Sequence, residues 1–153
     1  MIKTIEDLFK YINTEDQIIL MQKNYKFTSP LIIGNTSKII GNSCELSGLL
    51  LICNDIIIEN VTFSNSEDII NIRSDSKIKF NKCTFIGNNT NTAIILEPHS
   101  NSSVSLKQCT FSRFVSVISV NENNYLPLLK NCIFQFCTLA IDKIVSNSYI
   151  NVN

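Results

Sequence analysis

The chain has 153 residues, 44% of them hydrophobic, and its 13 basic and 13 acidic residues give a formal net charge of zero. This length and composition predict one soluble globular domain, residues 1–153, with a continuous core. No block of like charge occurs along the chain, so we expect neither a nucleic-acid partner nor a membrane anchor.

The N-terminus predicts a short amphipathic helix. Thr4 is a favourable N-cap, and Asp7 stands three residues further on. Apolar residues then recur at helical spacing on one face: Ile5, Leu8, Phe9 and Ile12. We expect residues 1–16 to cap one end of the core that residues 17–153 form, because the first turn of a repeat structure otherwise leaves apolar side chains and strand groups uncovered.

Short apolar runs follow the helix and predict strands. They cover residues 17–20, 31–33, 37–41 and 49–52. These runs resemble the first turns of a repeat whose corners are still irregular.

The rest of the chain repeats one six-residue pattern four times: apolar, two polar, Val or Cys, Thr or Ile, Phe. It occupies residues 58–63, 80–85, 106–111 and 129–134, and its phenylalanines recur after 22, 26 and 23 residues. A second apolar run follows each copy, at residues 69–72, 93–96, 117–120 and 140–142. These segments are rich in β-branched and aromatic residues and leave no room for helices between them.

Each repeat therefore predicts one coil of a parallel β-solenoid, with equivalent residues stacked at about 4.8 Å. Two interior ladders follow, one of Val61, Cys83, Cys109 and Cys132 and one of Phe63, Phe85, Phe111 and Phe134. A leucine-rich repeat is the alternative, but it requires Leu at positions where Ile, Val and Phe dominate here. Tyr149, Ile150 and Val152 predict a last strand with no obvious cap after it.

The six cysteines could form three disulfides. They lie inside strand-like runs rather than loops, which favours buried free thiols in a reducing compartment. No CxxC pair or group of histidines accompanies the aligned cysteines, so we predict no metal site and no cofactor.

Three segments carry a resemblance to a known family: Asn60-Val61-Thr62-Phe63, Ile39-Ile40-Gly41-Asn42 and Thr4-Ile5-Glu6-Asp7-Leu8. Over nearly its whole length the chain resembles the pectin-lyase-like superfamily. This resemblance implies an all-β fold, a right-handed parallel β-helix solenoid of about five to six coils with a short N-terminal capping helix. It leaves function open, because the superfamily includes polysaccharide lyases and hydrolases, viral tailspikes, adhesins and protein-binding modules.

The candidate binding residues come from strand alternation. If Ile70, Ile94, Ile118 and Ile141 face inward, two outward columns are Asn71, Ile95, Ser119, Asp142 and Arg73, Glu97, Asn121, Ile144. With the adjoining corner they give a candidate surface site of Asn71, Arg73, Asp75, Glu97 and His99. An acid–base pair beside an arginine suits proton abstraction next to a uronate carboxylate. An ordinary surface ion pair between Arg73 and Glu97 is the stronger interpretation, so we predict no catalytic residue.

We therefore expect a non-enzymatic structural or protein-binding module that binds another protein or another copy of itself through its rigid faces or its open C-terminal end. A small glycan-binding protein, or a polysaccharide lyase or hydrolase, is the alternative. The N-terminus lacks an apolar signal-peptide core, and Ile and Asn are abundant as in AT-rich coding sequences. We expect a cytoplasmic or virion-associated protein.

Overall fold

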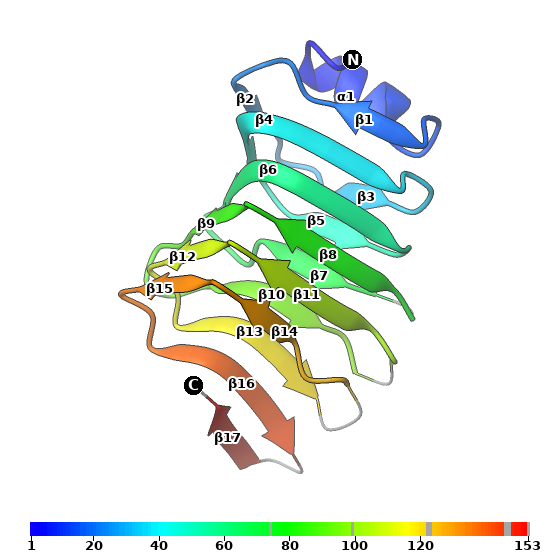
Figure 1. Ribbon diagram of the computed structural model, residues 1–153. Coiled ribbons are helices and arrows are strands. Elements are labelled where there is room, and N and C mark those ends of the chain that lie inside the picture. The colour runs from blue at the N-terminus through cyan, green and yellow to red at the C-terminus, as the bar shows by residue number, and fades with distance from the viewer. Residues whose placement is uncertain (74, 99, 122–123, 146–147, 153) are drawn as a thin grey trace.

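The computed structural model describes residues 1–73, 75–98, 100–121, 124–145 and 148–152. It is a parallel β-solenoid of about 6 turns with one short N-terminal helix, which confirms the predicted fold class. The coils stack from the helix at the N-terminal end to the last strands at the C-terminal end (Figure 1).

The elements follow one another in the order shown in Figure 1. They are α1 (Ile5–Tyr11), β1 (Gln17–Ile19), β2 (Asn24–Lys26), β3 (Leu31–Ile33), β4 (Lys38–Ser47), β5 (Leu50–Ile52), β6 (Ile56–Ser64), β7 (Ile70–Ile72), β8 (Lys77–Asn81), β9 (Thr84–Ile86), β10 (Thr92–Leu96), β11 (Ser103–Lys107), β12 (Thr110–Ser112), β13 (Ser116–Asn121), β14 (Leu128–Lys130), β15 (Ile133–Gln135), β16 (Leu139–Val145) and β17 (Ser148–Val152).

Two sheets form the wall of the solenoid. The ten-stranded sheet contains the path β14-β11-β8-β6-β9-β12-β15 together with β1, β2 and β4, and the seven-stranded sheet has the order β17-β16-β13-β10-β7-β5-β3. Pairs between neighbouring coils are parallel, whereas β17 returns antiparallel on β16. Successive coils therefore stack in register, and only the chain's last strand reverses.

A single left-handed residue bends the chain between the two halves of the ten-stranded sheet. Asn60, Lys82, Gln108 and Asn131 occupy this corner in successive coils, with φ values of 57°, 54°, 54° and 54°. Asn tolerates this conformation well, while Lys and Gln adopt it at a cost of about 1–2 kcal/mol. The corner directs the next residue, a valine or a cysteine, into the core.

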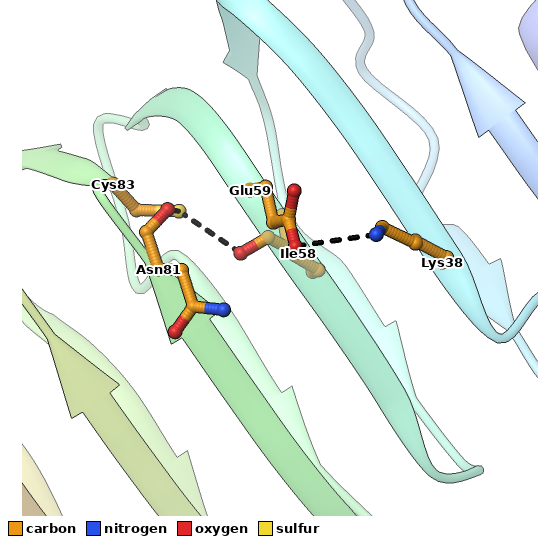
Figure 2. Close-up of polar contacts among 5 residues, drawn as sticks. All are labelled: Lys38, Ile58, Glu59, Asn81 and Cys83. Atoms are coloured by element: carbon orange, nitrogen blue, oxygen red, sulfur yellow. Dashed lines mark hydrogen bonds and ion pairs between the residues drawn. The ribbon is translucent and has the colours of Figure 1, made fainter.

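Both predicted interior ladders are present. Val61, Cys83 and Cys109 are buried, and Cys44 extends the ladder by pairing with Val61. The Cys83 thiol donates to the carbonyl oxygen of Ile58 at 3.5 Å (Figure 2). The Cys109 thiol donates in the same way to the carbonyl oxygen of Phe80 at 3.4 Å.

The phenylalanine ladder is a continuous aromatic stack. Ring centroids are 4.9 Å apart between Phe63 and Phe85, 4.6 Å between Phe85 and Phe111, and 5.4 Å between Phe111 and Phe134. In the other sheet Ile70, Ile94, Ile118 and Ile141 are paired in register and buried, as predicted. These stacked apolar columns form one core along the solenoid.

The helix α1 covers the first coil. The Thr4 hydroxyl oxygen accepts the backbone N–H of Asp7 at 3.0 Å, which confirms the predicted N-cap. Leu8 and Ile12 are buried against the core, whereas Phe9 is 41% exposed and meets Phe27 edge to face. The predicted apolar face is therefore only partly buried.

Two features differ from the sequence prediction. The strand β2 was not predicted, because Tyr25 is its one buried residue; the Tyr25 hydroxyl donates to the carbonyl oxygen of Ile2 at 2.6 Å. Phe134, predicted to be inside, is 37% exposed because no strand of the described structure pairs with β15 on its outer side. All six cysteines are free, with Cys44, Cys83 and Cys109 buried and the other three half-buried.

Candidate functional site

The predicted site on the seven-stranded sheet contains one direct contact. Arg73 Nε lies 2.8 Å from Glu97 Oε1, with side chains 46% and 39% exposed. Arg73 and Glu97 lie on adjacent coils, because the residues directly before them, Ile72 and Leu96, are paired in register. An ion pair with this exposure contributes about 0–1 kcal/mol. The geometry is that of a surface ion pair between neighbouring coils.

The other predicted residues do not extend this pair into a site. Asp75 Oδ1 accepts the backbone N–H of Asn101 at 2.7 Å, so this carboxylate stabilises a corner of the next coil. The Asn71 side chain is half-buried in the outward column. His99 lies outside the described residues. Five hollows in the described part of the chain, of about 310 to 650 Å³, are lined by residues other than Asn71, Arg73, Asp75 and Glu97.

Three of the cysteines resist ionisation, whereas the hydrogen bond with the Cys83 thiol lowers the pKa of Cys109. Burial raises the pKa of Cys44 to about 12 and also raises the pKa of Cys83 and Cys132, so these thiols resist forming the reactive thiolate. Among the described residues, no three His, Cys, Asp or Glu side chains gather as a metal site requires. The cysteine ladder is an element of core packing.

The last coil changes the character of the outer surface. Leu128 is in register with Ser105, and Ile133 is in register with Thr110. Phe136 follows Gln135, the partner of Ser112, and is therefore in register with Arg113. Three outward positions that are polar in the preceding coil are thus apolar here. They are exposed by 72%, 55% and 83% for Leu128, Ile133 and Phe136.

Phe136 combines this exposure with an unusual backbone. Its φ is 56°, a left-handed conformation that bulky side chains rarely adopt, and Arg113 has the same conformation with a φ of 64°. An exposed aromatic ring on a strained residue is a feature that clusters at binding surfaces. Sequence reasoning missed this surface, although the pattern carried a signal: the last copy has Ile133 where the others have Thr62, Thr84 and Thr110.

The same coil leaves two strands without a following neighbour. β14 and β15 are the terminal strands of the path through the ten-stranded sheet, so each has one unpaired backbone edge. The inward residues Leu129 and Phe134, each 37% exposed, lie on these strands. We call the five residues Leu128, Leu129, Ile133, Phe134 and Phe136 the C-terminal rim.

Comparison with known proteins gives no match: no family model, no curated protein and no solved structure corresponds to this chain. In the described part of the chain, no helix is both long and apolar enough to span a membrane. The C-terminal rim, found from register and exposure, is therefore the candidate functional site.

Proposed function

We propose that the protein is a non-enzymatic structural module that associates with a second copy of itself through the C-terminal rim. The observation that supports this proposal is the coordinated change of three outward positions, from Ser105, Thr110 and Arg113 in one coil to Leu128, Ile133 and Phe136 in the next. A missing neighbour explains exposed inward residues. A missing neighbour does not explain the apolar residues that point outward from the wall. An interface with another molecule explains them.

A second copy suits this surface better than a different partner. The edges of β14 and β15 present backbone donors and acceptors together, and a two-fold axis brings the same edge of another copy against them in antiparallel orientation. The end of the solenoid already accepts an antiparallel strand, since β17 pairs in this way with β16. Stacking of this end on the N-terminal end is blocked by α1, which covers the first coil. A closed dimer follows, rather than a filament.

Solution mass across a concentration series tests this proposal. We expect a monomer–dimer equilibrium for the native chain, measured by sedimentation velocity or light scattering. The combined variant Leu128→Ser, Ile133→Thr and Phe136→Arg gives each rim position the residue of the preceding coil, so the wall should still form. It should remain monomeric, with an unchanged circular dichroism spectrum.

Ile32→Thr is the matched control, because Ile32 is an exposed isoleucine in the strand β3, far from the rim in the stack of coils. This variant should dimerise as the native chain does. A native chain that stays monomeric at every concentration, or a rim variant that dimerises normally, contradicts the proposal. A mass that grows without limit indicates an open assembly and also contradicts it.

We further propose kinship with the right-handed, pectin-lyase-like parallel β-helices. The repeat lengths, the left-handed corner at Asn60 and the capping helix support this kinship. An experimental structure with left-handed coils would exclude it.

A further inference from the structure

Lysines that are far apart in the sequence gather on the outer face of the ten-stranded sheet. Lys107 is in register with Asn81 on one side and Lys130 on the other, and Lys82 follows Asn81 directly. Lys79 lies on the same face of β8, two residues before Asn81. Lys79, Lys82, Lys107 and Lys130 are all exposed. Pairing of neighbouring coils thus brings together lysines that lie about one repeat apart in the sequence.

Part of this face is a groove along the left-handed corner. A hollow of about 440 Å³ is lined by Ile40, Glu59, Asn60, Asn81, Lys82, Lys107 and Gln108. These residues come from consecutive coils, so the hollow crosses the strands and follows the direction of stacking. We call this hollow the corner groove.

The one acidic residue lining the corner groove is already neutralised. Glu59 Oε1 lies 3.3 Å from Lys38 Nζ on the neighbouring strand, as Figure 2 shows. Within the part of the chain that the structure describes, Lys82, Lys107 and Lys130 have no carboxylate within ion-pair distance. The groove therefore presents unpaired ammonium groups beside the side-chain amides of Asn60, Asn81 and Gln108.

We propose that the corner groove binds a linear sulfated glycan, independently of association through the C-terminal rim. Ammonium groups form charge-assisted hydrogen bonds with sulfate oxygens, and the amides offer donors and acceptors to sugar hydroxyls. Lys107 lines the groove, and Lys130 lies beside it on the adjacent strand, whose backbone is about 4.8 Å away. A polymer that pairs with both must carry anions at high density along its length, as a sulfated chain does.

Two other polyanions fit the groove less well. A single-stranded nucleic acid is bound through aromatic side chains that stack on its bases, and no aromatic residue lines this groove. Acidic peptide motifs are usually recognised by arginine clusters, and other peptides by a free strand edge or by apolar anchors. The cations that line this groove are lysines, and no arginine lines it. Both strands flanking the groove in its central coil, β8 and β9, are paired on each side, and Ile40 is the single large apolar residue that lines it.

Binding of heparin to the full chain tests the proposal. We expect the native protein to bind heparin with an affinity that falls as ionic strength rises, measured by isothermal titration calorimetry. The double variant Lys82→Asn, Lys107→Asn should lose about tenfold or more in affinity, or 1.4 kcal/mol. The fold should be kept, because asparagine already occupies the equivalent positions in other coils. Asn60 and Asn131 correspond to Lys82, and Asn81 corresponds to Lys107. Lys130 is left unchanged because it lies on β14, beside the rim.

The matched control is Lys3→Gln, Lys23→Gln, which removes the same charge from exposed positions near the N-terminus and should bind as the native chain does. Gln108→Lys, which copies Lys82 one coil later, should tighten binding. Fully desulfated, N-acetylated heparin should bind weakly. The proposal would be overturned if both double variants lost the same heparin affinity, or if desulfated heparin bound as tightly as heparin. Tighter binding of a thymidine oligonucleotide or of polyglutamate than of heparin would also overturn it. Rim variants should bind heparin normally, so failure of one proposal does not affect the other.

Discussion

The first and last coils of the solenoid carry the same kind of apolar ladder but are covered differently. At the N-terminal end α1 lies over the core, and Leu8 is completely buried. At the C-terminal end, among the described residues, β17 pairs with β16 alone, β14 and β15 each have one unpaired edge, and Phe134 is 37% exposed. One end is therefore covered by α1, while the other leaves apolar side chains exposed in the described structure.

Equivalent positions of the repeat therefore differ in their surroundings according to their place in the stack of coils. In a solenoid each coil contacts only its neighbours. The contribution of a ladder residue to the free energy of unfolding therefore depends on whether another coil packs on it. Phe111 has aromatic neighbours on both sides, whereas Phe134 has one. The same residue type is thus fully packed in the middle of the ladder and partly exposed at its end.

The largest effect is expected in the middle of the phenylalanine ladder. Phe111→Ala should lower the free energy of unfolding by about 3–5 kcal/mol, because it removes a fully buried ring and leaves a cavity. Phe134→Ala should cost about half of that or less, since its ring already meets water. Urea unfolding of dilute protein measures both.

The losses of unfolding free energy in Phe111→Ala and Phe134→Ala should become more similar as protein concentration rises. Association would cover Phe134 but cannot further bury Phe111. A loss at Phe134 that equals the loss at Phe111 in dilute protein would show that the end is already covered within one chain.

The next largest effect concerns the N-terminal cap. Leu8→Ala should destabilise the chain by about 2–5 kcal/mol, since Leu8 is the fully buried residue of α1. Thr4→Ala should cost about 1 kcal/mol by removing the acceptor for the Asp7 N–H. Thermal unfolding followed by circular dichroism gives both values.

Phe9→Ala is the control in the same helix, because Phe9 is 41% exposed whereas Leu8 is completely buried. If Leu8→Ala costs no more than Phe9→Ala, α1 does not cover the core in solution and the contrast between the two ends is lost.

The smallest effect is expected on the surface first predicted to bind a ligand. Arg73→Ala and Glu97→Ala should each change stability by less than about 1 kcal/mol, as exposed ion pairs do. A double-mutant cycle isolates the pair from other contacts of the two side chains. A coupling energy between Arg73 and Glu97 well above about 1 kcal/mol would contradict this expectation. Loss of heparin binding in either variant would indicate that this surface is a binding site.

Most of the wall could be predicted from the sequence because each coil repeats the same chemical pattern. The Val61–Cys132 and Phe63–Phe134 ladders and the inward isoleucines follow from alternation and repeat length alone. The cap follows from Thr4 and the helical spacing of apolar residues. β2 was missed because three residues with one buried side chain carry too short a pattern.

The candidate sites were harder to predict, because they depend on comparison between coils. Lys82 and Lys107 are 25 residues apart, and only the register places them in one groove. The rim required Leu128, Ile133 and Phe136 to be aligned with their polar counterparts and their exposure to be known. Sequence reasoning instead selected Arg73 and Glu97, which strand alternation and the alignment of the second strands place in one outward column.

Backbone hydrogen exchange across a concentration series tests the central claim most directly. If the C-terminal rim joins two copies, amides of residues 128–136 should become more protected as the protein is concentrated, because the open edges of β14 and β15 gain partners, while amides of β8 and β9 should not change. Protection at residues 128–136 that is independent of concentration, or that rises equally in all strands, would contradict this account.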